Sequence, residues 1–269
     1  MTKYLDMNIK SLLTNPYLIF WSILFIEFWV FMWAYVFGGE LPLVEEAVKL
    51  YMATAYGNLL MLSLSGAAVT IASSLLYSSK SIRYVTKYTK LSPSRFLFEN
   101  LSSSLVVLLM ISGIMFSSVL AVFFSKFGML ILPMDIAGMI FSIFLGTLFI
   151  YALSLFLNLL IVNLKASRSA SFISFLPLIL AFTSYSALWI DFKSAVYISP
   201  FNCITSICYY YFSGESPPTG NFFMPGDKTL VNVGLTLSSL LAWLALLIVL
   251  DILLLKKMRG VGVEDIRVT

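Results

Sequence analysis

The hydrophobic pattern of this chain consists of six long apolar runs separated by shorter polar segments. The runs cover residues 18–37, 52–77, 101–124, 136–163, 172–190 and 230–255. Each has about 20 residues or more, which is the length of helix that crosses the hydrocarbon core of a bilayer. Lipid offers the backbone no hydrogen-bond partner, so each run must pair its own amides and carbonyls, as a helix does. We therefore predict an all-α integral membrane protein in which residues 1–269 form a single transmembrane domain with six spans.

Basic residues are concentrated in alternate connections between these runs. If the amino terminus lies in the cytosol, the inner segments contain 13 of the 17 Lys and Arg residues. The outer segments contain Lys49, Lys126, Lys193 and Lys228. Because cytoplasmic loops are enriched in Lys and Arg, this asymmetry predicts that both termini are cytosolic. The net charge of +4 thus follows the membrane, and we expect no nucleic-acid partner.

Two segments outside the spans have a helical pattern of their own. In residues 1–16, Leu5, Ile9, Leu12 and Leu13 recur at helical spacing, which favours an amphipathic helix on the inner surface over a frayed tail. Asn15-Pro16 would end it. Residues 193–229 are too long for a turn and include "PFNCITSICYYYFSGE", a helix-capable stretch too short to cross. We predict that this stretch is re-entrant at the outer leaflet and that "GESPPTGNFFMPGDK" forms an outward-facing loop.

Composition excludes several kinds of chemistry. The chain is 60% hydrophobic and 11% charged, has no histidine and has two cysteines, Cys203 and Cys208. Nucleophile arrangements that require histidine are therefore impossible, and no metal site is expected. A Walker-type phosphate loop and paired carboxylates for Mg²⁺ are missing, so a membrane enzyme is disfavoured. Five positions apart on a helix, the two thiols are expected to be unpaired and buried.

Two acidic residues lie inside predicted spans. Glu27 is near the middle of the first, where an ionised carboxylate usually faces a bundle interior or a water-filled cavity. It could line a substrate path or couple transport to protons, or it could hydrogen-bond a neighbouring helix and serve packing alone. Asp251 lies five residues before Lys256, so we expect it to reach the inner interface.

The first predicted span is rich in aromatic residues. They are Phe20, Trp21, Phe25, Phe28, Trp29, Phe31, Trp33, Tyr35 and Phe37. Contact with lipid and packing explain many rings in one membrane helix. The alternative is an apolar route for a hydrophobic substrate, for which Phe25 and Trp29, with Glu27, are the candidates.

The connection at 78–96, "SSKSIRYVTKYTKLSPSRF", has five positive charges and no negative charge. Ile82, Val85 and Tyr88 recur at helical spacing, so it can form a short amphipathic helix parallel to the membrane that Pro93 stops. Either anionic lipid or a cytosolic partner could bind such a surface.

The order of these features resembles the permease subunit of an ABC transporter of the ABC-2 exporter class. The resemblance rests on "NPYL" after the surface helix, "LSPSRFLFEN" in the basic connection, "ISPFN" before the re-entrant stretch and the tail "KKMRG". Many relatives have an acidic residue and a Gly-Thr pair in the coupling helix, where this chain has Lys80, Ser81, Ile82 and Arg83.

The resemblance implies a multi-pass protein of the cell (plasma) membrane that forms an export path with a second permease copy or a related permease. Two cytosolic ABC ATPase subunits would bind ATP and Mg²⁺, and this chain would bind no cofactor. The residues implied to dock the ATPase are Lys80, Ile82, Arg83, Tyr84, Lys87, Tyr88 and Lys90. A hydrophobic or amphipathic cargo is expected: a drug, a lipid, a peptide or a lipid-linked glycan. The alternatives are a stand-alone secondary transporter or channel that uses Glu27, and a membrane anchor that transports nothing.

Overall fold

The chain folds into a bundle of long helices. The computed structural model describes residues 2–88, 93–164, 169–223 and 228–257, with side chains described within 5–72, 98–164, 169, 171–223 and 228–254. The α-helices are α1 (Thr2–Leu13), α2 (Pro16–Ile19), α3 (Phe25–Phe31), α4 (Glu45–Tyr88), α5 (Pro93–Phe127), α6 (Ile136–Asn163), α7 (Ala170–Ser186), α8 (Pro200–Ser213) and α9 (Val233–Lys257). Over these ranges the only β structure is two isolated bridges, so the all-α prediction is confirmed.

Five helices of the described chain are long and apolar enough to cross a membrane. They cover Pro16–Phe37, Glu45–Ala72, Phe98–Phe127, Ile136–Asn163 and Val233–Leu254. The predicted run at 172–190 is shorter as a helix, because α7 has 17 residues and ends at Ser186. Beyond it, the amides of Leu188 and Ile190 turn back to the carbonyls of Tyr185 and Ser186. The structure thus describes a multi-pass membrane protein with five full-length spans and one shorter apolar helix.

The first span is continuous but changes its winding twice. Two π-helical stretches, η1 (Phe20–Leu24) and η2 (Met32–Phe37), flank α3. An α turn has 3.6 residues, so a side chain four positions further on is displaced around the helix axis in one direction. A π turn holds more residues, so the same step of four positions displaces the side chain in the opposite direction. Alternating the two windings keeps side chains at every fourth position on one side of this span.

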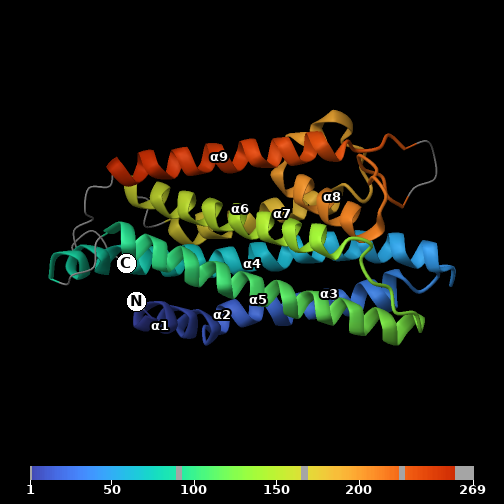
Figure 1. The fold of residues 1–269 in the computed structure, drawn as a ribbon, viewed down its shortest axis with the longest axis horizontal. Coiled ribbons are helices and arrows are strands. Elements are labelled where there is room, and N and C mark those ends of the chain that lie inside the picture. The colour runs from blue at the N-terminus through green and yellow to red at the C-terminus, as the bar shows by residue number, and fades with distance from the viewer. Residues whose placement is uncertain (1, 89–92, 165–168, 224–227, 258–269) are drawn as a thin grey trace.

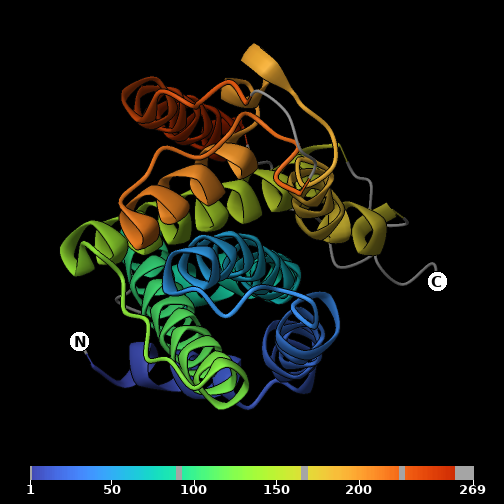
Figure 2. The same ribbon diagram turned by 90° about the vertical axis from the view of Figure 1, so that its right-hand side faces the viewer.

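α4 is the central helix of the bundle, as the end-on view shows (Figure 2). Its span window is buried throughout, against α5, α6, α7 and α8. Hydrogen bonds join it to its neighbours: Ser63 donates to the carbonyl of Ser22 at 2.7 Å, and Asn158 of α6 donates to that of Ala72 at 3.0 Å. Without a hydrophobic driving force between helices in lipid, such close packing and hydrogen bonding hold the bundle together.

The basic connection differs from the expected separate surface helix. α4 runs without a break from Glu45 to Tyr88, so the helical part of 78–96 is a direct extension of the second span. The sequence from Ala67 to Tyr88 has no Gly or Pro that would interrupt a helix. Pro93 does not stop a helix but is the first residue of α5, a position that suits its fixed φ.

The helix ends gather at the two ends of the bundle (Figure 1). α1, the last turns of α4, the first turn of α5 and the last turn of α9 lie at the end that we call the basic end. The first turn of α4, the connection from α5 to α6 and helix α8 lie at the opposite end, which we call the cap end. The segments that the charge pattern assigned to one side of a membrane therefore lie at one end of the molecule.

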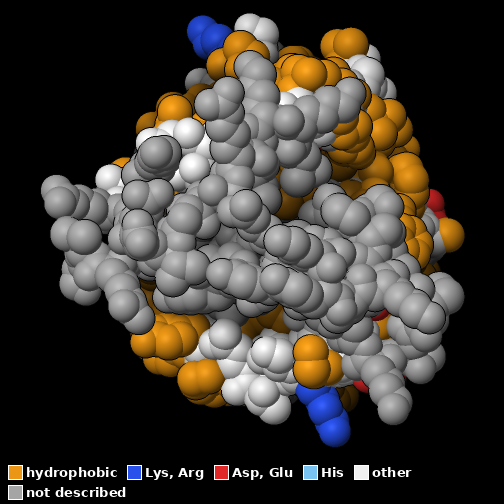
Figure 3. Space-filling model, turned by 90° about the vertical axis from the view of Figure 1, so that its left-hand side faces the viewer, with side chains coloured by type: hydrophobic (Ala, Val, Ile, Leu, Met, Phe, Trp, Pro, Cys, Tyr) orange, Lys and Arg blue, Asp and Glu red, His pale blue; other side chains and the backbone are white. Residues whose placement is uncertain are grey.

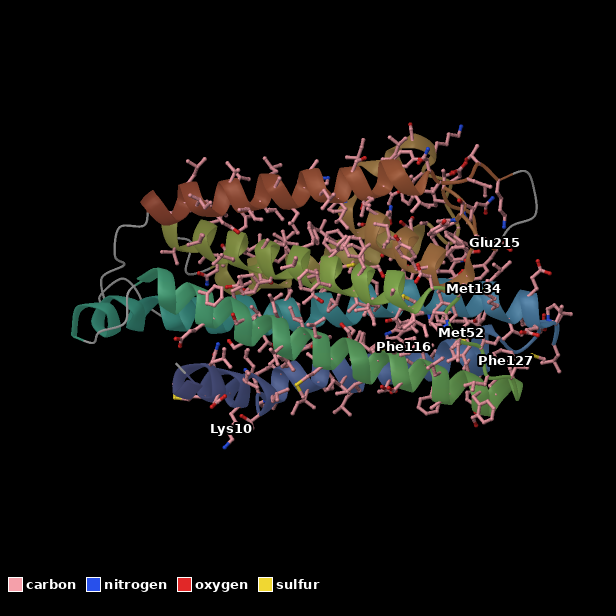
Figure 4. All side chains as sticks on the ribbon, in the orientation of Figure 1. Lys10, Met52, Phe116, Phe127, Met134 and Glu215 are labelled. Atoms are coloured by element: carbon pink, nitrogen blue, oxygen red, sulfur yellow. The ribbon has the colours of Figure 1, made fainter. Side chains whose placement is uncertain are left out.

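α1 forms part of the basic end. Its expected helical pattern is confirmed: Asn8 donates to Ser103 of α5 at 2.5 Å, Leu12 is buried, and Asn15 caps the next helix with Pro16 at its first position. Figure 4 places Lys10 at this end and Met134 and Glu215 near the cap end. In the view onto the basic end, hydrophobic side chains form much of the rim (Figure 3).

At the cap end, α8 and the chain after it cover the bundle. The predicted re-entrant stretch is indeed a helix, capped by Ser199, and most of its side chains are buried. The following loop is folded back rather than free: the amides of Thr219 and Asn221 donate to the carbonyls of Thr229 and Ala187. The Thr219 hydroxyl and the Lys193 amide donate to Asp191, and these bonds lower the pKa of that carboxyl.

Candidate functional site

Four rings follow one side of the first span. Trp21, Phe25, Trp29 and Trp33 are spaced every four residues, and we call them the aromatic ladder. Successive centroids lie 5.3 Å apart for Trp21 and Phe25 and 6.3 Å apart for Phe25 and Trp29, both in edge-to-face geometry. The predicted path residues Phe25 and Trp29 therefore lie together, on the side of the helix that the two π-helical turns keep in line.

The ladder faces α7. Trp21 packs edge-on against Phe175 with centroids 5.7 Å apart, and both Trp29 and Trp33 contact the ring of Tyr185, at 6.3 and 6.1 Å. Other rings of the first span, such as Phe28 and Phe31, are exposed on the outside of the bundle. The aromatic residues of this span are thus divided between a packed side and an exposed side of one helix.

A cavity of about 760 Å³ opens where the ladder reaches the cap end. The first span contributes Trp29, Trp33 and Phe37 to its wall, and α7 contributes Phe182, Tyr185 and Ser186. Tyr51 of α4 and three connections complete the lining: Glu40, Leu41 and Pro42 after the first span, Leu188 and Trp189 after α7, and Phe223 after α8. Cavities of roughly 300–1,000 Å³ with apolar, aromatic walls are typical binding sites for small molecules.

Trp33 holds this wall together. Its indole N–H donates to the Tyr185 hydroxyl at 2.9 Å, and its carbonyl accepts from the Tyr51 hydroxyl at 2.7 Å. Its ring also packs against Phe223, with centroids 6.0 Å apart. A buried side chain thus links the first span, α4, α7 and the cap, and it fixes the orientation of the rings around the cavity.

Among the described residues that line the cavity, one is charged. It is Glu40, which is exposed in the connection after the first span. Glu27 does not line the cavity; it is half-buried on α3, next to Ile26 on the packed side. Asp251 is not at the surface either, since it lies on the buried side of α9 with Leu240 and Leu247.

A much smaller cavity has a largely polar lining that includes residues of α4, α7 and the chain after α8. It has a volume of about 20 Å³, enough for one water molecule, and Ser184, Ala187 and Phe222 line it. Asn58 and Asn202 also line it, and the side-chain oxygen of each has no hydrogen-bond partner among the described residues. The predicted unpaired state of the thiols is confirmed, because Cys203 and Cys208 are free and buried on α8.

Six of the seven residues proposed to dock an ATPase lie at the opposite end of the molecule from the cavity. Lys80, Ile82, Arg83, Tyr84, Lys87 and Tyr88 belong to the last turns of α4, and their side chains lie outside the described residues. Lys90 also lies outside them. Within the described part of the chain, no group of acidic or thiol side chains could hold a metal ion.

Sequence reasoning missed several residues of the cavity. Tyr51, Tyr185, Glu40 and Phe223 come from four different segments, and no local pattern marks them. One signal was present in the sequence. Four aromatic residues at every fourth position predict one aromatic side of a helix, although the pattern does not show which neighbouring helix packs against that side.

The architecture defines a class, a helical multi-pass membrane protein with a large aromatic cavity near one end of its bundle. Comparisons with family models, with curated proteins and with solved structures find no match. Function must therefore be argued from the geometry of this chain.

Proposed function

We propose that this chain is the membrane-spanning permease of an ATP-driven exporter of the ABC-2 class, with the aromatic cavity as part of its translocation path. α7 is the fifth of six spans, both termini are cytosolic, and the protein resides in the plasma membrane. The basic end then faces the cytosol and the cap end faces outward. The cargo is hydrophobic or amphipathic, in keeping with the apolar lining of the cavity.

The length and position of α4 support this proposal most directly. The helix begins beside the cavity, where Tyr51 forms part of the wall, and continues to Tyr88 at the basic end. A helix of 44 residues is about 66 Å long, roughly twice the thickness of the hydrocarbon core. One rigid element therefore connects the basic end to the cavity, and a push at one end can displace the other.

The partners in this proposal bind at the basic end and along the membrane. Two cytosolic ATPase subunits supply ATP and Mg²⁺ and contact the last turns of α4 through Arg83 and Lys87, with α1 beside the contact. A second permease completes the path.

α7 crosses the membrane with 17 residues, which is at the short end of the range for a membrane helix.

Charge reversal at the basic end tests this proposal. Arg83→Glu with Lys87→Glu should uncouple ATP hydrolysis from transport, because the partner loses its cationic contact while the remaining Lys and Arg residues maintain topology. The measurement is cargo movement per ATP hydrolysed, in vesicles that contain this chain and its ATPase. Lys49→Glu with Lys193→Glu, which reverses two charges at the cap end, is the matched control.

Two outcomes would contradict the proposal. Unchanged coupling in the Arg83/Lys87 variant would mean that the charge of this segment serves only lipid contact or topology. Transport by the purified chain alone, driven by an ion gradient and abolished by Glu27→Gln, would establish the stand-alone transporter instead.

A further inference from the structure

We infer that the aromatic cavity selects hydrophobic organic cations over neutral or anionic molecules of the same shape. The inference rests on the proposed function, since it names the cargo class of that same cavity. Two independent features carry it: the number of aromatic residues in the wall and the sign of the one charge among the described lining residues.

The rings provide the first feature. Eight of the thirteen lining residues are Trp, Tyr or Phe, and they come from the first span, α4, α7 and the cap. The face of an aromatic ring is negative, so a cation within about 6 Å of its centre is attracted, most strongly by Trp. Two of these rings are tryptophans from different segments: Trp29 belongs to the first span and Trp189 follows α7.

The charge provides the second feature. Glu40 places a carboxylate on the lining, and none of the described lining residues is Lys or Arg. The accessible rings of the lining are Phe37, Phe182, Trp189 and Phe223, whereas Trp33, Tyr51 and Tyr185 are buried. An organic anion would therefore meet a carboxylate and negative ring faces, with no Lys or Arg among the described lining residues to compensate.

The volume sets the size of the ligand. A cavity of about 760 Å³ accommodates a drug-sized molecule with several rings. The competing occupant is a lipid acyl chain, which an apolar wall would also accept. An acyl chain has no charge, so occupancy by lipid gives no discrimination between cations and anions of equal shape.

The experiment compares tetraphenylphosphonium with tetraphenylborate, which share shape and differ in the sign of their charge. Binding to the full chain in nanodiscs is measured by equilibrium dialysis, and empty nanodiscs supply the blank for partition into lipid. We expect the phosphonium ion to bind at least about tenfold more tightly, since ring faces and the carboxylate act in the same direction.

Two variants test which side chains cause the selectivity for cations, and a third variant is the control. Glu40→Gln should weaken phosphonium binding about threefold and leave borate binding unchanged or stronger. Trp189→Leu, which keeps the wall apolar, should also weaken phosphonium binding, about two- to fivefold. Glu45→Gln removes a nearby exposed carboxylate that is not part of the lining, and it should leave the ratio unchanged.

Equal affinity for the two ions, or an unchanged ratio in Glu40→Gln and Trp189→Leu, would overturn cation selection and indicate a cavity that lipid fills. These measurements use this chain without an ATPase, so their failure leaves the proposed coupling at the basic end intact. A chain that selects the phosphonium ion but fails the coupling test retains this inference and refutes the ATP-driven mechanism alone.

Discussion

At the scale of single residues, a few small or polar side chains decide how closely the helices approach. Gly66 of α4 lies against the first span, where an added Cβ would be 2.6 Å from the carbonyl oxygen of Trp21. Ser63, one turn earlier, donates to the carbonyl of Ser22. The contact between α4 and the first span therefore depends on a missing side chain and a hydrogen bond, as expected for helices in lipid.

Gly66→Ala should therefore destabilise the protein by about 1–3 kcal/mol, because the methyl group meets backbone atoms that cannot rotate away. Gly113→Ala is the matched control, since a Cβ at that exposed helical position meets nothing within 4 Å. It should change stability by no more than about 0.5 kcal/mol. Unfolding in a denaturing detergent measures both variants, and equal effects would show that the close approach at Gly66 is not needed.

One local signal was correct about a helix boundary: the first helix ends before Asn15-Pro16, as predicted. Asn15-Pro16 and Ser199-Pro200 both place a capping side chain before a proline at the first helical position. The free thiols also followed from spacing. The buried position of Asp251 could not be predicted from the sequence. Contact with α6 determines which side of α9 is buried, and an almost uniformly apolar helix does not indicate which side that is.

At the scale of elements, α4 connects the two ends of the molecule. Its buried part lies at the centre of the bundle, and its last turns contain the basic residues. The sequence predicted a span and a basic helix here, but as two separate helices. The change from apolar to charged residues is interpreted as the end of the first helix. Helix formation continues through such a change when no Gly or Pro interrupts it.

Ser79→Pro tests whether this continuity matters. A proline in the interior of a helix costs about 3 kcal/mol locally and produces a kink, so the basic end should no longer move with the cavity wall. We expect ATP-driven transport to be lost, while tetraphenylphosphonium binding at the cavity is retained. Ser79→Ala preserves the helix and should preserve transport, measured in the same vesicles; full transport by the proline variant would mean that α4 does not transmit the motion.

At the scale of the whole molecule, the two ends differ in what they offer a partner. The cap end holds the cavity beneath a folded connection, and the basic end collects α1, the end of α4 and the end of α9. The distribution of Lys and Arg along the chain is enough to group the segments of the basic end together. The cavity could not be anticipated in the same way, because its wall forms only when four distant segments pack together.

The orientation of the basic end is the central claim, because an ATPase can act on α4 only from the cytosol. The direct measurement is labelling of Ser81→Cys with a membrane-impermeant maleimide. Native Cys203 and Cys208 supply little background: burial raises their pKa to about 11 and about 12, so both remain protonated and unreactive near neutral pH. The account predicts no labelling in intact cells and full labelling after permeabilisation; labelling of Ser81→Cys in intact cells would contradict it.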